Sequence, residues 1–558
     1  MLARIREYPG VATAVVVALA AALLLPSLPQ VRLPSGFVAT GAALVPPIVA
    51  ICLALATRRL LPSLLGAVVV GAMLRHHGAF LTAGSKQYLF DNLAEPAHLY
   101  ILGFTLALLG MVQTTTLSGG AQGIVESVAR HARTRRSAQV STWVMGLLVF
   151  FDDYANCMLV GPTMRPLTDK LRVSREKLAF LIDSTAAPVA GIVIISTWVG
   201  YETGLLDDVS KSLSLDQNGY ALLLAGLPLR FYCVLTLLFV LLCAATERDF
   251  GPMLRAERRA LHKGHLARPG ATLMGGSAEA EAQTQTEAPG RWTNAAVPVG
   301  IVVLGTLLGL VVDGGGSAAL RADPMRALSL SFWRQTLGAS ENNTQVLFIA
   351  AFSGAAAAVL LPTLRGDLSL GRGSLAFLRG VRSGLYAAVV LVCAWALAQV
   401  CKDLGTGPVV IAALGKSLPP VFVPATTFIA AAGVAFATGT SWGTMAILIP
   451  TAMPIAHELG GMPLLVLTVA SVLDGAIFGD HCSPISDTTL MSSIAASSDH
   501  LDHVSTQFPY ALTVMAVALL GGYLPVAFGA PIWLAYGICT LALLGIVYGV
   551  GRPVQESP

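Results

Sequence analysis

The sequence predicts an all-α protein that crosses a membrane many times, and three observations support this fold class. Charged residues make up only 12% of the 558 residues, whereas apolar types make up 55% and the mean hydropathy is +0.71. Many apolar runs approach the roughly 20 residues that a helix needs to cross a bilayer. The third observation is an internal repeat between the two halves of the chain. Together they exclude a soluble protein. A net charge of only +4 does not indicate a surface that binds nucleic acid.

Twelve full spans are expected from the apolar runs. Two further apolar stretches, 138–165 and 421–457, are interrupted by polar tips, and each predicts a re-entrant hairpin. Two of the spans carry polar residues at mid-length, which predicts broken helices. The twelve spans lie near residues 10–28, 40–57, 60–78, 97–118, 177–200, 219–245, 293–313, 343–364, 383–403, 462–490, 508–528 and 531–550.

The spans divide the chain into five segments, and Lys and Arg clusters between them predict its orientation. By the positive-inside rule both termini lie in the cytoplasm, with the protein in a bacterial-type inner membrane. The polar, low-complexity stretch between the two repeats is typical of a flexible cytoplasmic linker. The segments are an extra N-terminal transmembrane helix (1–30), a first repeat (40–245), the linker (246–292), a second repeat (293–528), and a C-terminal transmembrane helix with its tail (531–558).

The repeat is visible in a proline motif. The pattern Pro-Thr-x-x-Pro at 162–166 recurs at 450–454, an offset of 450 − 162 = 288 residues. Because the predicted topology brings the two units into the membrane from opposite sides, the repeats are inverted, an architecture typical of secondary transporters. At the same offset the polar tips align, Asp152 with Thr440, Asp153 with Ser441 and Asn156 with Thr444.

Carboxylates at membrane depth cost free energy and therefore need a partner or a function. Buried carboxyls with nearby hydroxyls and unwound backbone offer oxygen ligands to a small cation, and a proton competes for the same oxygens. The alternative for each residue is a structural role, as a hydrogen-bonded carboxylate or a packing hydroxyl. The candidate cation- and proton-binding residues are Asp152, Asp153, Asn156, Asp183, Ser184, Thr185, Thr440, Ser441, Thr444, Asp474, Asp480, His481, Ser483, Ser486 and Asp487.

Within this set the candidate Na⁺ ligands are Asp152, Asp153, Thr440, Ser441, Asp480 and Asp487. A transition-metal site at Asp480, His481, Cys482 and Asp487 is disfavoured because the residues lack a recognised ligand spacing. No nucleotide-binding or hydrolase motif is present in the sequence, so the protein is not expected to be an enzyme or to hold a cofactor. Its cargo would be Na⁺ or Li⁺ and H⁺.

Four segments, which hold both tips and the polar centre of the 462–490 span, resemble the NhaC-type Na⁺/H⁺ antiporter family. They are 151–156, 438–444, 479–488 and 502–510, and the resemblance extends over about residues 95–515. It implies an ion transporter with paired hairpins, elevator-like and in many members dimeric. It also implies an alternative, because such relatives include exchangers that couple cations to organic acids or amino acids. Function therefore has to be argued from the site.

No basic residue occupies the hairpin tips themselves, so an organic anion would depend on helix N-termini and a co-bound cation for charge balance. The nearest cationic residues are Arg165, Lys170, Arg230 and Lys402, and Arg230 is expected to extend its side chain to the membrane surface. Trp198 and Tyr201 are expected to anchor a span at the membrane interface, and His500 and His503 to lie in a solvated loop. The eight cysteines contain no C-x-x-C pair and are expected to be packing residues.

Overall fold

The computed structural model describes residues 25–555 apart from 34–36, 58–59, 121, 125–132, 275–289, 330–331, 334–335, 338, 341, 407, 410–411 and 413–418. Almost all of this part is helical, which confirms the predicted all-α fold. Two short antiparallel ladders join β1 (Val31–Arg32) to β2 (Val38–Ala39) and β3 (Arg248–Asp249) to β4 (Arg552–Pro553). Most of the predicted first span, 10–28, lies outside the described residues.

The described helices are divided between the two halves of the chain. In the first half they are α3 (Val45–Thr57), α4 (Leu60–His76), α5 (Asp91–Leu93), α6 (Pro96–Leu117), α8 (Arg135–Leu148), α9 (Asp153–Lys170), α10 (Arg175–Ala190), α11 (Thr197–Ser212), α12 (Gly219–Gly226), α13 (Phe231–Thr246) and α14 (Gly251–Lys263). In the second half they are α16 (Thr293–Asp313), α17 (Gly316–Ala322), α19 (Asn343–Leu364), α20 (Leu370–Leu404), α22 (Val423–Thr438), α23 (Ser441–His481), α24 (Asp487–Ala496), α25 (His500–Val517), α26 (Leu524–Ala527) and α27 (Ile532–Gly549).

Short 3-10 and π-helical turns connect several of these helices. The 3-10 turns are Leu25–Ser27, Gly41–Leu44, His77–Ala79, Leu227–Leu229, Pro324–Leu328 and Pro420–Phe422. The π-helical turns are Phe80–Gly84, Lys86–Phe90 and Ala518–Tyr523.

Nine helices among the described residues are long and apolar enough to cross a membrane, or ten if α12 and α13, which meet at a 44° bend, count as one span. Twelve single-helix spans are therefore not found in this part of the chain. The predicted span 177–200 is broken at residues 191–196, between α10 and α11. The predicted span 40–57 contains only the 13-residue helix α3 after a 3-10 turn.

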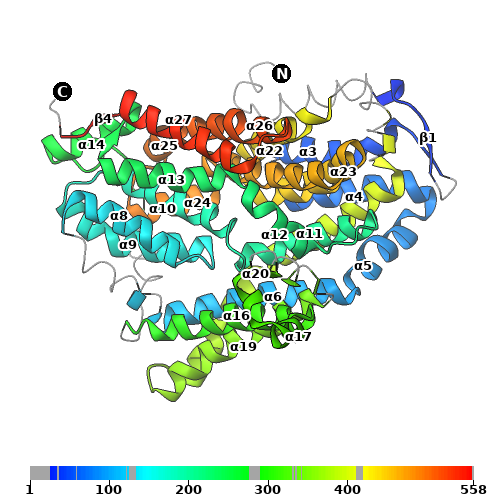
Figure 1. Cartoon of the computed structure of the whole chain (residues 1–558), viewed down its shortest axis with the longest axis horizontal. Coiled ribbons are helices and arrows are strands. Elements are labelled where there is room, and N and C mark those ends of the chain that lie inside the picture. The colour runs from blue at the N-terminus through cyan, green and yellow to red at the C-terminus, as the bar shows by residue number, and fades with distance from the viewer. Residues whose placement is uncertain are drawn as a thin grey trace.

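Two helix-turn-helix units enter the molecule from opposite ends. Helices α8 and α9 form the first and lie at the left of Figure 1, whereas α22 and the first part of α23 form the second and lie at the right. Each unit leads into a broken span, α10 followed by α11 and the second part of α23 followed by α24. This is the arrangement that the inverted repeat predicts.

Helix α23 changes direction at Gly460 and Gly461, whose backbone angles are not helical. Gly461 has a φ of +63°, a conformation that glycine adopts without a Cβ clash, and Pro463 restarts the helix. This turn separates the outgoing part of the second hairpin from the helix that ends at His481.

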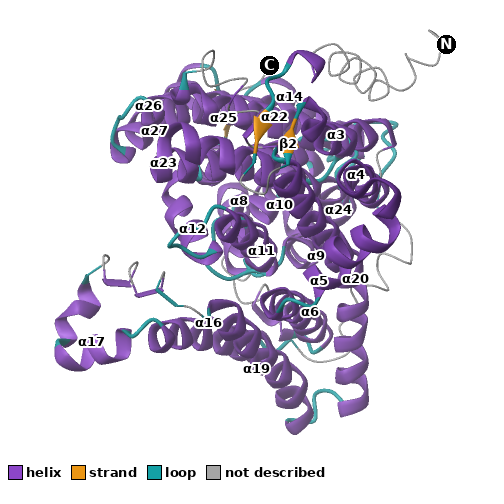
Figure 2. Ribbon diagram, turned by 90° about the vertical axis from the view of Figure 1, so that its right-hand side faces the viewer, coloured by secondary structure: helices purple, strands orange, loops and turns teal. Residues whose placement is uncertain are grey.

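A second layer lies beneath the hairpins. Helices α6, α16, α19 and α20 pack on one another, and Figure 2 shows α16, α19 and α17 standing apart from the upper body of α22, α23 and α25. Helix α6 contacts α11, and α20 contacts α4, α11 and α23, so both helices join this layer to the rest of the molecule.

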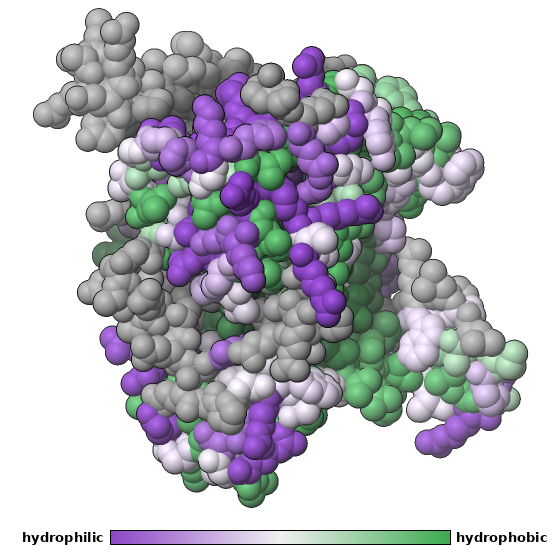
Figure 3. All heavy atoms as spheres, turned by 90° about the vertical axis from the view of Figure 1, so that its left-hand side faces the viewer, coloured by the Kyte–Doolittle hydropathy of each residue, from purple (hydrophilic) through white to green (hydrophobic). Residues whose placement is uncertain are grey.

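The predicted linker is not flexible throughout. Residues 248–263 form β3 and α14, and Glu257 of α14 is fully buried where it pairs with Arg135 at the start of α8. Lys177 and Asp249 form a second buried pair, with 2.6 Å between Nζ and Oδ1. Paired charges fix this segment against α8 and α10, and residues 275–289 of the linker lie outside the described residues. Figure 3 shows hydrophilic side chains gathered on this end of the molecule.

Candidate functional site

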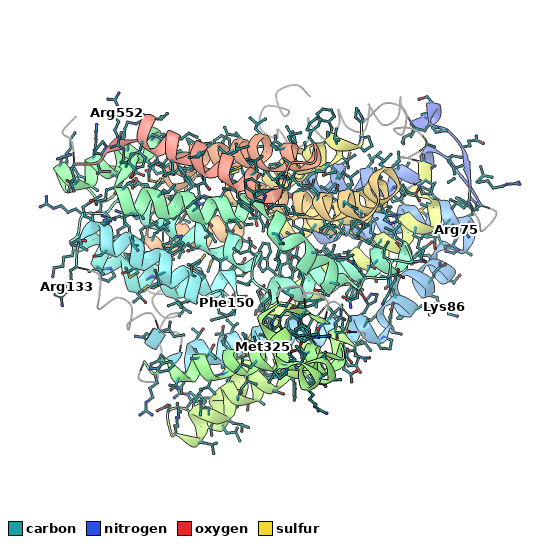
Figure 4. The ribbon with its side chains drawn as sticks, in the orientation of Figure 1. Arg75, Lys86, Arg133, Phe150, Met325 and Arg552 are labelled. Atoms are coloured by element: carbon teal, nitrogen blue, oxygen red, sulfur yellow. The ribbon has the colours of Figure 1, made fainter. Side chains whose placement is uncertain are left out.

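The tip of the first hairpin lies in the middle of the molecule. Figure 4 places Phe150 between the end marked by Arg133 and Arg552 and the opposite end marked by Arg75 and Lys86. A membrane-embedded tip is expected at this depth, since the hairpin enters from one face and returns to it.

Asp152 closes this tip by capping α9. Its Oδ1 accepts a hydrogen bond of 2.8 Å from the backbone N–H of Ala155, and its Oδ2 accepts one of 3.1 Å from the hydroxyl of Thr197. The backbone N–H of Thr197 also donates to Phe151 O at 3.1 Å. Asp152 therefore joins the tip to the start of α11, just after the break in that span.

The tip of the second hairpin repeats this construction. Thr440 caps α23 and accepts from the backbone N–H of Gly443 at 3.4 Å, at the position that aligns with Asp152 in the repeat. Gly439 ends α22 with a φ of +68°, and an added Cβ there would lie 2.6 Å from Ile485 O. Ser483 donates to Phe436 O at 2.7 Å. The second tip thus packs against the break between α23 and α24.

Asp480 connects the second tip to its broken span. The Ser441 hydroxyl donates to Asp480 Oδ2 at 2.7 Å, while the buried Oδ1 has no hydrogen-bond partner. Asp153 and Asp480 are each 3% exposed and both interact electrostatically with Asp487. Asp487 is exposed and accepts a hydrogen bond from Tyr154 of the first hairpin. Carboxylates from both halves therefore meet at one place.

Asp183 lies in a hydrogen-bonded cluster next to these carboxylates. Its Oδ2 accepts from Gln507 Nε2 at 2.6 Å and its Oδ1 accepts from the Ser492 hydroxyl at 3.2 Å. Ser184 is hydrogen-bonded to His481 Nε2 at 3.0 Å, and Tyr232 is hydrogen-bonded to His481 Nδ1 at 2.7 Å. The cluster joins α10, α13, α23, α24 and α25.

Asp474 belongs to a separate ionic cluster. Its carboxylate accepts hydrogen bonds from Arg230 Nε at 2.8 Å and from the Tyr523 hydroxyl at 2.7 Å, and Arg230 Nη1 lies 3.6 Å from Glu202 Oε1. Arg230 is fully buried at the bend between α12 and α13. The expectation that it reaches the membrane surface is wrong, because two buried carboxylates hold it in the interior.

Comparison with known proteins gives this arrangement its context. Residues 189–524, more than half of the chain, match the Na⁺/H⁺ antiporter family. The chain belongs to that family. It is a multi-pass membrane protein and a secondary transporter, and its relatives with a named activity are antiporters and not enzymes.

Three relatives and one solved structure are similar to this chain. An uncharacterized protein of Haemophilus influenzae is 29% identical over 91% of this chain and 95% of its own length. The malate-2H⁺/Na⁺-lactate antiporter of Bacillus subtilis is 34% identical over 26% of this chain and 32% of its own length. The arginine/ornithine antiporter ArcD of Halobacterium salinarum is 36% identical over 24% and 28%. The Alcanivorax borkumensis YdaH transporter shares the fold, with a TM-score of 0.54 and 16% identity over 94% of this chain and 99% of that one.

Several predicted site residues of this antiporter-family protein make structural hydrogen bonds. Asn156 donates from Nδ2 to Gly146 O at 2.8 Å and to Thr185 O at 2.9 Å, which ties the first hairpin to α10. Thr185 and Thr444 each donate to a carbonyl of their own helix, and Ser486 caps α24. None of these contacts tests whether the residues bind a cation.

Several residues that line the site were not predicted to belong to it. Tyr154, Thr197, Ser492 and Gln507 each contact one of the candidate carboxylates. Gln507 is part of the family-like segment 502–510, which is the signal that could have identified it. Tyr154 likewise lies in the family-like segment 151–156, whereas Thr197 and Ser492 are ordinary polar residues outside these segments.

Four further expectations are wrong. Trp198 and Tyr201 do not lie at the membrane interface, because both are 1% exposed and Tyr201 stacks on Trp442 of the second hairpin with 4.2 Å between ring centroids. His503 is fully buried on α25, and His500 is half-buried at the start of that helix. Neither histidine is part of a solvated loop, because both are hydrogen-bonded to Ser493 of α24.

The remaining cationic candidates lie away from the tips. Lys170 is exposed at the end of α9, and Lys402 is exposed near the end of α20. Arg165 is partly exposed in the last turns of α9. The eight cysteines are free thiols, and all except Cys52 are buried, in agreement with their predicted packing role.

Proposed function

We propose that this protein is a Na⁺(Li⁺)/H⁺ antiporter of the cytoplasmic membrane, with Asp153, Asp480 and Asp487 at the centre of its exchange site. The observation that carries this proposal is a surplus of negative charge. Five carboxyl groups, those of Asp152, Asp153, Asp183, Asp480 and Asp487, surround the hairpin tips. Among the described residues, the one basic side chain within 4.0 Å of any of them is His503, next to Asp183.

Such a cluster needs protons or cations to persist at membrane depth. Two like charges about 4 Å apart repel by about 4 kcal/mol at an effective dielectric constant of 20. Binding a proton or a small cation relieves this repulsion, and both compete for the same oxygens. The unpartnered Asp480 Oδ1 is the atom best placed to accept either one.

The two broken spans support alternating access to this site. Each hairpin tip is bonded to the break in a neighbouring span, at Thr197 for the first and at Ser483 for the second. Interrupted helices that meet near mid-membrane are typical of carriers in which one repeat-built unit moves against another. We therefore propose that the hairpin units move in an elevator-like manner against the layer formed by α6, α16, α19 and α20.

The test is exchange by purified protein in liposomes. A trapped pH dye reports proton movement after Na⁺, Li⁺ or K⁺ is added across a preset proton gradient. Asp480→Asn keeps the size of the side chain and removes its charge, so we expect exchange to fall at least tenfold while the protein still folds. Asp323→Asn is the matched control, because Asp323 is an exposed carboxylate far along the chain from both tips. Wild-type exchange by Asp480→Asn would contradict the assignment.

A second candidate is exchange of an organic acid or amino acid coupled to Na⁺ or H⁺ at the same place. Tyr154 and Ile485, 41% and 38% exposed, lie beside Asp487 and offer aromatic and apolar surface that a bare ion does not need. Two relatives carry names of this kind. If inorganic cations alone move no protons but one solute from a panel of organic acids and amino acids starts coupled flux, this candidate replaces the first.

A further inference from the structure

Two histidines and one serine connect the buried Asp183 to the basic end of the molecule. Ser493 Oγ lies 2.9 Å from His503 Nδ1 and 3.0 Å from His500 Nδ1. On its inner side, His503 Nε2 lies 2.9 Å from Gln507 Oε1 and 4.0 Å from Asp183 Oδ2. His500 is half-buried and follows the turn at residues 497–499.

That turn belongs to the arginine-rich end of the molecule. Arg175 donates to Ala496 O and Ser497 O, and Arg268 pairs with Asp499 and Asp502. The positive-inside rule places this end in the cytoplasm.

The hydrogen-bond partners fix the tautomers of both histidines. Gln507 Nε2 donates to the backbone carbonyl of His481 and to Asp183, so its Oε1 is the atom that faces His503. His503 Nε2 must therefore carry a hydrogen. His500 Nε2 faces Pro484 O at 2.8 Å and must also carry one. When both rings are neutral, both Nδ1 atoms are bare acceptors.

This count leaves at least one of the two Nδ1 atoms without a hydrogen-bond donor. The Ser493 hydroxyl has a single hydrogen, yet it is surrounded by three acceptors, His500 Nδ1, His503 Nδ1 and Thr489 O at 2.8 Å. One additional proton on His500 turns its Nδ1 into a donor to Ser493, and Ser493 can then donate to His503. The geometry therefore accommodates a mobile proton, because a neutral cluster leaves one Nδ1 acceptor without a donor.

We propose that His500, Ser493 and His503 form a proton path between the basic end of the molecule and Asp183, one of the five carboxyl groups of the proposed exchange site. This inference rests on the proposed exchange of protons. His500 passes its Nδ1 proton to Ser493 Oγ while Ser493 passes its own proton to His503 Nδ1. His503 then releases its Nε2 proton to Asp183 Oδ2, and the carboxylate becomes a carboxylic acid.

The charges around the path suit this direction of transfer. His503 is fully buried next to His481, which opposes a lasting positive charge on its ring, so His503 holds the proton only in passing. At the other end His500 adjoins Asp499. Although burial acts to raise the pKa of Asp499, hydrogen bonds from the backbone N–H groups of Thr272, Asp502 and Leu501 and the charge of Arg268 hold that pKa below its ordinary value. An ionised Asp499 places negative charge beside the outer end of the path.

Two rearrangements complete each transfer. The gap of 4.0 Å between His503 Nε2 and Asp183 Oδ2 has to close for the last step. Because His503 receives the proton on Nδ1 and releases it from Nε2, its ring must turn before the next proton passes. His500 takes up a new proton from water at its half-buried edge.

The test separates proton movement from cation movement in the full-length protein. Proteoliposomes are assayed for Na⁺-driven proton flux with a trapped pH dye, and for exchange of ²²Na⁺ against Na⁺ at equal pH on both sides. For His500→Asn we expect proton flux to fall about tenfold or more, in line with the loss of a proton-transfer group. Exchange of ²²Na⁺ should not change, and added imidazole should restore much of the proton flux.

His262→Asn is the matched control, since His262 is an exposed histidine of α14 at the same end of the molecule. Ser493→Ala, compared with the hydroxyl-bearing Ser493→Thr, repeats the test at a second member of the path in case the first variant does not reconstitute. Equal loss of both fluxes, an unchanged proton flux, or a loss that imidazole does not restore would overturn the path. A wild-type protein that exchanges ²²Na⁺ but moves no protons would instead refute the proposed antiport, and the path with it.

Discussion

Arg230 illustrates how burial decides the role of a charged residue. It lies at the bend between α12 and α13 and is held by Asp474 and Glu202, which come from α23 and α11. Two carboxylates and one guanidinium leave the cluster with a surplus negative charge if all three ionise. Breaking a buried ion pair costs more than making it gains, because the remaining charge keeps its desolvation penalty.

We therefore predict that Arg230→Gln strongly destabilises the protein. The loss of the only described cation in this cluster should cost about 3–5 kcal/mol of unfolding free energy. Thermal unfolding in detergent, followed by tryptophan fluorescence, measures the effect. Arg326→Gln is the control, because Arg326 is 58% exposed and pairs only weakly with Asp323 at 3.8 Å. Equal melting temperatures for the two variants would show that the buried cluster contributes little.

Residue chemistry in the sequence could predict the candidate carboxylates but not their partners. Asp152, Asp183 and Asp480 stand out because each interrupts an apolar stretch. The contacts of Asp183 with Gln507 and of Asp487 with Tyr154 join residues more than 300 positions apart. Only the folded arrangement of the helices determines such pairs.

At the scale of helices, the hairpins were easier to predict than the breaks. Each hairpin has a polar tip inside an apolar run, and the structure has a turn at each tip. Polar residues at mid-length predict a break in the span 177–200, but the break at 191–196 begins with the apolar run Gly-Ile-Val-Ile-Ile, so hydropathy does not give its position. Helix α14 was not predicted, because its many arginines are typical of a solvated loop, although one face of the helix is buried.

The tip of the second hairpin gives a prediction at this scale. Gly439→Ala would place a methyl group 2.6 Å from Ile485 O and force alanine into a left-handed backbone with a φ of +68°. We expect a loss of about 1–3 kcal/mol from the backbone strain, together with reduced transport because the tip is pushed away from the break.

Gly433→Ala provides the control within the same helix. Nothing lies within 4 Å of an added Cβ there, and alanine is the better helix former by about 1 kcal/mol. Its stability should be unchanged or slightly higher, as measured by the same unfolding assay. If the two alanine variants have the same unfolding stability and the same transport rate, the close packing of the second tip does not matter for transport.

For the whole molecule, the charge distribution makes a prediction about sidedness. The Arg133 and Arg552 end carries the arginine-rich linker contacts, and Lys86 lies at the opposite end (Figure 4). The positive-inside rule therefore places Lys86 outside the cell and Arg552 inside.

A membrane-impermeant maleimide tests this on intact cells. Lys86→Cys should react at once, whereas Arg552→Cys should react only after the membrane is permeabilised. Both positions are exposed, and background labelling is low because seven of the eight native cysteines are buried. The reverse pattern would invert the topology and, with it, the side from which the first hairpin enters.

The aligned caps of the two hairpins differ in one respect that affects the transport cycle. In a carrier with two identical inverted halves, the state open to one side would be the symmetry mate of the state open to the other, and the two would be degenerate. Here an aspartate caps the first tip and a threonine caps the second, at equivalent positions. The degeneracy is broken, since a free-energy difference of about 1.4 kcal/mol already biases two states tenfold. The resting protein should consequently favour one orientation even without a gradient.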